Sequence, residues 1–479
     1  MECDNSTFLI DKKAKVIDDS IKVPALLFVL SSAGWLVAGT ILLLIGSIRL
    51  TNPGFLSGCE YFTYGKITDA QQSMWAYGWA CNVVFGVCLW VIARLSGRKI
   101  ASSSILLVAG LFWNLAVTIG VVGIFKGEYT GLSWIAFHPA VNTLLLIAYA
   151  MIGVWGIVSF MTRTNRNVFA AQWFILAALL VFPWIFSTAS IALSDKMTLG
   201  ILETVIHSWF VHNYFALFLT PAAVGVAYYL VPKFTGKAIS GYSLAPIAFW
   251  ALIIIAPWGG GEFLLGGPVP MWLQAAGQVS VLLMVIPVGI IVYNIFGSLF
   301  CRKKGVCACA IHPFSKFIVF GMLGLIAYTA LKGALVFPEI NAKLHFTFTT
   351  LASEYLGFYA FFSMIMFGGV YFMLPRLLGK DWCSKESILM QFVFSFTGII
   401  MLVFFMLKSG CIQSQYVGQE GNVMQALQGP LRGQILAISL LLISHIMFLG
   451  HCLCLIASAL CPCKALCHDE SKESATVNA

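Results

Sequence analysis

Charged residues are scarce in this chain. They make up 10% of its 479 residues, whereas hydrophobic residues make up 60%. An ordinary soluble domain carries about 25% charged residues, so the composition excludes a soluble protein of usual make-up. The apolar residues instead gather in repeated runs of roughly 20 residues, each long enough to cross a hydrocarbon core of about 30 Å. The sequence therefore predicts an all-α integral membrane protein.

The apolar runs predict about twelve transmembrane helices in a single membrane domain, 23–460, between a tail at 1–22 and a tail at 461–479. The first run is too long to be the core of a cleavable signal peptide. The expected helices are Val23–Ile48, Met74–Ala93, Ser103–Phe125, Trp134–Phe160, Ala170–Leu193, His207–Val231, Leu244–Leu265, Trp272–Phe300, Phe317–Phe337, His345–Leu374, Ile388–Leu407 and Leu436–Leu460.

Lysine and arginine are unevenly distributed between the predicted loops. If the N-terminus is cytoplasmic, 20 of the 28 Lys and Arg residues fall on the cytoplasmic side. Such an excess follows the positive-inside rule, so both termini are expected in the cytoplasm. Cationic loops on that side also suit an anionic membrane surface. The net charge of +9 therefore predicts the lipid bilayer, and no nucleic acid, as a partner.

Several motifs of soluble chemistry are missing. The sequence has no HExxH pair, no paired Cys-x-x-Cys finger, no phosphate-binding Walker loop and no Ser-His-Asp arrangement. Of the fourteen cysteines, Cys59 and Cys411 alone are clearly assigned to the outer side. They could form one disulfide with each other if the two outer loops meet. Seven others lie on the predicted cytoplasmic side, where thiols stay reduced.

Ionisable residues inside the predicted helices are few, and each is costly in a bilayer and thus a functional candidate. These residues are His207, His212, Glu262, Lys332, His345, Glu354 and His445. His207 and His212 are five positions apart and so point to different faces of a helix. His212 with Glu262 makes at most half of a metal's first shell. Two interpretations remain open for His212, a buried hydrogen-bonded histidine or a cofactor ligand.

From about residue 60 to 410 the chain resembles subunit I of the haem-copper oxidases, and within that family the cbb-type (C-family) cytochrome c oxidase catalytic subunit. The order and spacing of five stretches carry the resemblance. They are YGKITDAQQSMWAYGWACN (64–82), FHPAVNTLLLIAYAMIGVWG (137–156), HNYFALFLTPAAVGVAYYLVPK (212–233), FWALI (249–253) and LGFYAFFSMIMFGGVYFMLP (356–375). The resemblance implies the twelve-helix oxidase arrangement in a bacterial inner (cytoplasmic) membrane.

The resemblance also shows where the family's metal ligands are expected. Six histidines and one tyrosine carry the family's chemistry, and five of those histidines and the tyrosine are replaced here. Gln71 stands at a haem-ligand position, Glu262 and Phe263 replace two copper ligands, Ala256 replaces the tyrosine, and Ser353 and Tyr355 replace the two remaining haem ligands. His212 is the copper-ligand position that is retained. His345 matches a family histidine near the haem propionates.

These replacements predict a chain that binds no cofactor. A low-spin haem needs two strong axial ligands, and one histidine holds copper poorly. The preferred interpretation is a non-catalytic accessory or structural subunit that assembles with other membrane subunits of a respiratory complex. Its emptied centre is expected to hold a polar cluster of His212, Glu262 and Lys332, with Lys332 paired to Glu262 or Glu354.

Two other interpretations remain open. The first is a divergent haem-copper oxidase or nitric oxide reductase-like enzyme with unusual ligands, holding haem b and copper. Glu262 favours it, because the nitric oxide reductase relatives use a glutamate beside their iron. The second is an ion-conducting or transport protein that reuses the cavity, lined by His212, Glu262 and Lys332.

Overall fold

The computed structural model describes residues 2–100, 102–164, 167–194, 200–300, 314–416 and 422–460, with side chains from residue 13 onward. Within these ranges the chain is helical, apart from short loops and an isolated bridge between Tyr129 and Phe137. The predicted tail at 461–479 lies outside the described residues. Within the predicted tail at 1–22, residues 2–22 are helical and continuous with the first spanning helix.

Twelve helical segments of the described chain are long and apolar enough to cross a membrane, which confirms the predicted number. They are α1 (Glu2–Thr51); α2 (Tyr64–Ser73), η2 (Met74–Cys81) and α3 (Asn82–Ser96); α4 (Ser103–Lys126); α5 (Pro139–Met161); α6 (Ala170–Ser194); α7 (Ile201–Asn213), η3 (Tyr214–Leu219) and α8 (Thr220–Thr235); η4 (Tyr242–Leu244), α9 (Ala245–Ile255), η5 (Ala256–Trp258) and η6 (Gly261–Leu264); α10 (Met271–Leu283) and α11 (Val285–Leu299); α13 (Ser315–Leu335); α15 (Phe348–Tyr355), η7 (Leu356–Ser363) and α16 (Met364–Leu378); α17 (Lys385–Gln415); and α18 (Val423–Leu460).

Three of the twelve segments form the centre of the bundle. The most apolar windows of 64–96, 201–235 and 348–378 are 100%, 100% and 94% buried, whereas those of the other nine are 33–61% buried. A helix that is apolar on all sides is expected to be surrounded by protein. The C-terminal parts of these segments, α3, α8 and α16, contact one another pairwise, so the other helices form a ring around them.

Each central segment contains a π-helical stretch near its middle. These stretches are η2, η3 and η7. π-Helical turns are rare and often occur at functional sites, because the extra residue per turn re-aims the side chains. Their presence in all three central segments, and η3 directly after His212, marks this level of the bundle as the place to look for a site.

The loop expected between the last two spanning helices is shorter in the structure. Polar residues at both ends of the loop expected between the last two helices are helical, since α17 continues to Gln415 and α18 begins at Val423. Hydropathy locates only the apolar part of a helix, whereas the hydrogen-bonded backbone continues into the polar region. Cys59 and Cys411 are both free thiols in this structure.

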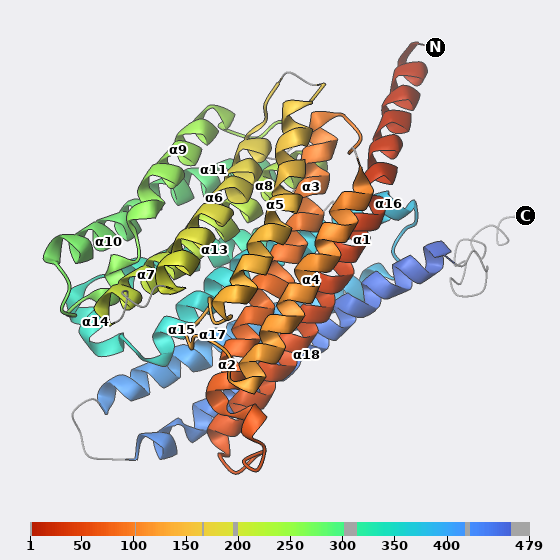
Figure 1. The fold of residues 1–479 in the computed structure, drawn as a ribbon. Helices are drawn as coiled ribbons and strands as arrows, with labels where there is room; N and C mark the ends of the chain where they lie inside the picture. Colours follow the sequence, from red (N-terminus) through yellow and green to blue (C-terminus); the bar gives the residue numbers. More distant parts are fainter. Residues whose placement is uncertain are drawn as a thin grey trace, which may run out of the picture.

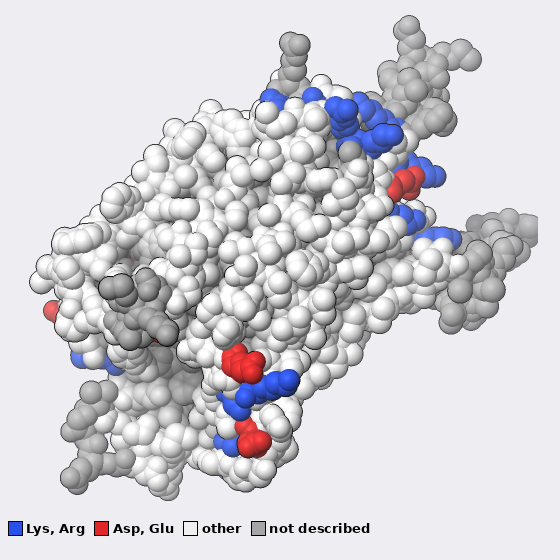
Figure 2. Space-filling view, in the orientation of Figure 1, with Lys and Arg blue, Asp and Glu red and all other residues white. Residues whose placement is uncertain are grey.

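The first and last helices of the described chain, α1 and α18, lie side by side in the bundle (Figure 1). Helix α1 packs against α18 and also against α3 and α4. Figure 2 shows a broad uncharged flank with the charged side chains gathered at its two ends, and most lysines and arginines at the end where the N-terminus lies. An apolar belt between two polar ends is what an integral membrane protein requires.

The even number of spanning helices predicts that both termini lie on the same side of the membrane. A fluorescent protein that folds only in the cytoplasm is expected to be bright when fused to either terminus. Alkaline phosphatase, which is active only outside the cytoplasm, is expected to be inactive at both. Opposite results at the two termini would mean an odd number of spans and would contradict the fold.

Candidate functional site

His212 and Glu262 meet at the centre of the bundle. His212 lies in the last turn of α7, before the π-helical η3, and Glu262 lies in η6, after a break of three glycines in its helix. The Nδ1 atom of His212 is 2.8 Å from Oε1 of Glu262. Glu262 Oε2 accepts a 2.5 Å hydrogen bond from the backbone N–H of Gly260. Both side chains are buried, so their contact offsets part of the cost of burying them, while Nε2 of His212 has no hydrogen-bond partner among the described residues.

The glycine break makes room for this histidine. A Cβ atom on Gly259 would lie 2.1 Å from Nε2 of His212, and one on Gly260 would lie 2.6 Å from the backbone of Trp209. Gly260 also has a φ of +108°, which a residue with a side chain rarely adopts. The backbone of the break therefore lies directly against the imidazole, and a β-carbon at position 259 has no space.

Lys332 lies close to the pair but does not contact its carboxylate. The Nζ atom, on α13, is 3.7 Å from the centroid of the Phe263 ring, which is the geometry of a cation–π contact. In the part of the chain that the structure describes, no carboxylate lies within the 4.0 Å ion-pair distance of Lys332. The expected direct pair with Glu262 or Glu354 is therefore wrong. Glu262 bonds His212, and Glu354 accepts a 3.0 Å hydrogen bond from Trp134.

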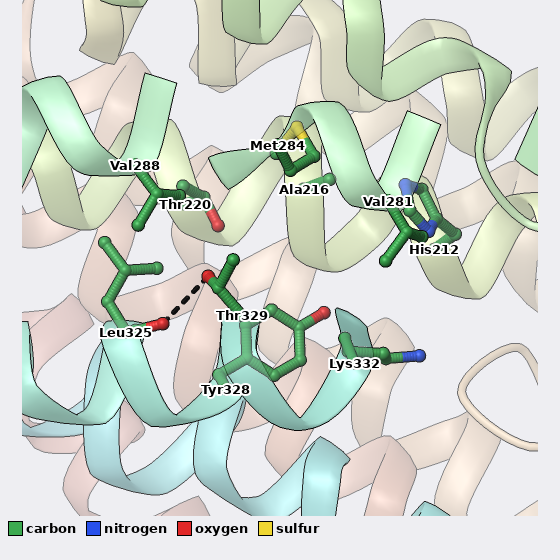
Figure 3. A pocket seen from close by; sticks show the side chains of 10 residues that line it. All are labelled: His212, Ala216, Thr220, Val281, Met284, Val288, Leu325, Tyr328, Thr329 and Lys332. Carbon is green, nitrogen blue, oxygen red and sulfur yellow. Dashed lines mark hydrogen bonds between the residues drawn. The ribbon is translucent and has the colours of Figure 1, made fainter. Parts of the chain in front are cut away.

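A row of cavities runs past these groups. The first, about 30 Å³ in volume, lies between the central helix and α10, α11 and α13, with His212 and Lys332 at one end (Figure 3). The second, of about 20 Å³, is lined by Glu262, Phe263 and Lys332. A third of about 230 Å³ shares Phe263 and His345 with the second. The first two are each about the size of one water molecule.

Aromatic rings fill the region around Tyr355. The indole ring of Trp75 stacks on Phe358 at 5.5 Å between centroids and makes edge contacts with Tyr355 and Tyr359. Gln71, one turn before Trp75, is 1% exposed and its amide nitrogen has no hydrogen-bond partner. Such rings pack the space between the second and tenth spanning segments.

The remaining candidates are held by ordinary hydrogen bonds. Ser353 donates a 2.7 Å hydrogen bond to the Thr350 carbonyl, His207 Nε2 is 2.8 Å from the Ser133 carbonyl oxygen, and His445 Nδ1 is 2.9 Å from Thr40. Ala256 is fully buried in η5. Across the described ranges, nowhere do three or more His, Cys, Asp or Glu side chains gather as metal ligands.

His345 lies in the loop between α14 (Pro338–Leu344) and α15, where its ring stacks on Phe346 at 4.0 Å between centroids. It lines the second and third cavities. Burial and the nearby Lys332 ammonium lower the pKa of this imidazole, because both disfavour the protonated form. It therefore faces the cavities as a neutral ring near pH 7.

Sequence reasoning found His212, Glu262 and Lys332 but missed two groups that shape the site. Trp134 was expected to begin a spanning helix, yet it lies in a loop and its indole donates a hydrogen bond to Glu354. Gly259 was not a candidate, because its contact with His212 depends on a pairing of helices that periodicity does not supply. The run of three glycines was the available signal.

Comparison with known proteins agrees with the architecture. The model of the family "Cytochrome C and Quinol oxidase polypeptide I" matches residues 23–425. A cytochrome c oxidase subunit 1 homolog of Agrobacterium tumefaciens (strain T37) is 22% identical over 398 residues, covering 81% of this chain and 72% of that protein. The Cbb3-type cytochrome c oxidase subunit CcoN1 of Stutzerimonas stutzeri is 20% identical, covering 74% of this chain and 75% of that protein.

A solved structure supports the same assignment at the level of the fold. It is the cryo-EM structure of a heme-copper terminal oxidase dimer, which superposes with a TM-score of 0.74 at 14% identity and covers 94% of this chain and 84% of that chain. The twelve helices, the three buried central segments and the match over most of the sequence lead to one conclusion. The chain is an integral membrane protein that belongs to the cytochrome c and quinol oxidase polypeptide I family.

Proposed function

We propose that this chain is a non-catalytic subunit with the oxidase subunit I fold, which binds neither haem nor copper and serves an accessory or structural role in a respiratory membrane complex. The observation that carries the proposal is the state of His212, the one copper-ligand position that the chain retains. Its Nδ1 atom is hydrogen-bonded to the Glu262 carboxylate, and its Nε2 atom lies against the backbone of Gly259.

The side chains at this centre do not fit a copper ion. A copper site of this family needs three imidazoles, and here the other two positions hold Glu262 and Phe263. The Phe263 ring has no ligand atom and packs under the Lys332 ammonium. A closed histidine–glutamate pair is thus the simpler role for His212.

The side chains do not fit a low-spin haem either. The amide of Gln71 and the hydroxyl groups of Ser353 and Tyr355 are weak substitutes for two axial imidazoles. The Trp75 ring packs against Tyr355 and Phe358, which fills space between the second and tenth spanning segments. The first two cavities beside the centre, at about 30 and 20 Å³, are far too small for a macrocycle.

A subunit role is supported by the family and by the shape of the chain. The relatives are named as subunits of cytochrome c oxidases, and the bundle keeps their architecture over most of its length. For this chain we therefore expect partner membrane subunits and a location in the bacterial inner membrane, with both termini in the cytoplasm. A bundle that keeps its packing without its cofactors retains the surfaces by which such subunits assemble.

A second candidate function is an ion path. The row of three cavities supports it, because Glu262, Lys332 and Glu354 line cavities that share residues from one to the next. Buried ionisable groups along a row of cavities are typical of proton and ion pathways. Ion flux into liposomes that contain the purified chain, compared with Glu262→Gln, tests this candidate. Flux that depends on Glu262 would support it over the accessory role.

The proposal predicts that the purified chain carries far less than one haem per molecule. The measurement is a reduced-minus-oxidised absorption spectrum with pyridine haemochrome quantitation. A relative that retains its ligand histidines, prepared in the same way, is the control.

A second measurement uses the tagged chain isolated gently from its native membrane together with its partner subunits. This preparation is expected to contain haem bound to the partners, and the chain should contain none once the subunits are separated. Haem b bound stoichiometrically to the separated chain would contradict the proposal.

The packed centre predicts a specific mutational rescue. Gly259→Ala is expected to lower the free energy of unfolding by about 1–3 kcal/mol, because the new β-carbon overlaps the imidazole. His212→Ala removes the ring, so the Gly259→Ala change should cost much less in the double variant. Thermal unfolding in detergent measures all three.

The matched control is Gly289→Ala in α11, where a Cβ atom meets nothing within 4 Å. This change should be neutral or slightly stabilising, since alanine favours a helix over glycine. Equal costs for Gly259→Ala with and without the imidazole would mean that the two groups do not touch, and the closed state of His212 would be wrong.

A further inference from the structure

A basic cavity lies at the end of the bundle where the N-terminus is, far along the chain from the residues of the central site. It has a volume of about 510 Å³ and is lined by Lys13 and Ile17 of α1, Arg94 and Leu95 of α3, Thr164, and Tyr229 and Lys233 of α8, among others. Three of the residues that line it are cationic and none is acidic. Figure 2 shows that lysine and arginine side chains are concentrated at this end.

The arginine of this cavity is held in a fixed position. Its Nε atom is 2.9 Å from Oδ1 of Asp18, and the same carboxylate oxygen accepts a 2.9 Å hydrogen bond from the Trp90 indole. The guanidinium also lies over the Trp90 ring, 5.5 Å from its centroid. A guanidinium has five N–H donors in a rigid fork, so the Asp18 contact leaves most of the fork available to an anion.

The two lysines extend the positive surface on either side. The Lys233 Nζ lies over the Tyr229 ring at 5.9 Å from its centroid. The Lys13 Nζ lies near Gly97, 3.8 Å from where a Cβ atom on that glycine would be. Both side chains are exposed, and Asp18 balances only one of the three positive charges. The cavity therefore attracts an anion from the surrounding solution or membrane.

A second, apolar cavity adjoins the basic one. Its volume is about 340 Å³, and it shares Leu95, Tyr229 and Lys233 with the basic cavity. The rest of its wall comes from the start of α6, the end of α8 and the loop before α9. Phe169 and Tyr242, which line it, are 38% and 41% exposed, so its wall reaches the outer surface of the bundle.

We propose that these two cavities together bind one anionic phospholipid, with its phosphate against Lys13, Arg94 and Lys233 and an acyl chain in the apolar cavity. Both cavities lie where spanning helices end, at Ser96 of α3 and Thr235 of α8, which is the level of the lipid headgroups. A basic pocket between helix ends is a recognised means of binding a lipid headgroup. Lysine stems lie along apolar surface while their charges reach the headgroup level.

The test uses the full-length chain, stripped of lipid in detergent, with lipid binding measured by native mass spectrometry. Phosphatidylglycerol is expected to bind at one copy in preference to phosphatidylcholine. Each cation near an anionic surface contributes enough to change affinity about fivefold. The Lys13→Gln/Lys233→Gln double variant should therefore bind phosphatidylglycerol roughly 25-fold more weakly.

Two matched controls separate the site from the general charge of this end. Lys15→Gln/Lys380→Gln removes the same charge from exposed positions that do not line the cavity, and it should leave binding nearly unchanged. Ala238→Phe places a ring in the apolar cavity and should weaken binding, whereas Ser243→Phe places it outside the residues that line this cavity and should not. Lys13, Lys233 and Ala238 line the cavities, whereas the control positions do not. Thermal unfolding checks that each variant is folded.

Three outcomes would overturn the proposal. Equal binding of phosphatidylcholine would mean an apolar groove without charge recognition. Competition by glycerol 3-phosphate at the same concentration as phosphatidylglycerol would mean a site for free anions in which the acyl chain has no part. Unchanged binding by both the lysine double variant and Ala238→Phe would place the lipid elsewhere on the bundle.

Discussion

The contact between the His212 imidazole and the Glu262 carboxylate is the interaction on which the centre of this bundle depends. Each group alone would be an uncompensated polar group in the interior of a membrane protein, where water is not available to solvate it. Together with the Gly260 N–H they form two hydrogen bonds that join four polar atoms. The backbone of Gly259 lies against the ring, so a break in a transmembrane helix and a buried histidine–glutamate contact support each other.

Aromatic side chains occupy much of the interior of this bundle. A cofactor contributes volume and contacts to a protein interior, and an empty space of that volume is destabilising. Here the Trp75, Tyr355 and Phe358 rings pack against one another between the second and tenth spanning segments. The cavity that His212 lines has a volume of about 30 Å³. These rings therefore occupy interior space that would otherwise be empty.

Each of the three central segments contains a π-helical stretch. A π-helical turn alters the direction in which later side chains point, so it affects every contact beyond it along the helix. Removing one would rotate the rest of a fully buried segment against its neighbours. The packing of these buried segments therefore depends on η2, η3 and η7, whether or not a ligand is held there.

The sequence by itself determined the membrane class, the number of spanning helices and the resemblance to the oxidase family, because each follows from composition and local order along the chain. It also placed His212 and Glu262 close to one centre, through the family's alignment. Only the tertiary structure decided that Glu262 contacts His212 and that Lys332 lies over Phe263. Those partners depend on how the helices are rotated about their axes, and in helices that are apolar on all sides no periodic pattern records that rotation. The cavities at the N-terminal end were hidden for the same reason, since Lys13, Arg94 and Lys233 come from three helices that only the packed bundle brings together.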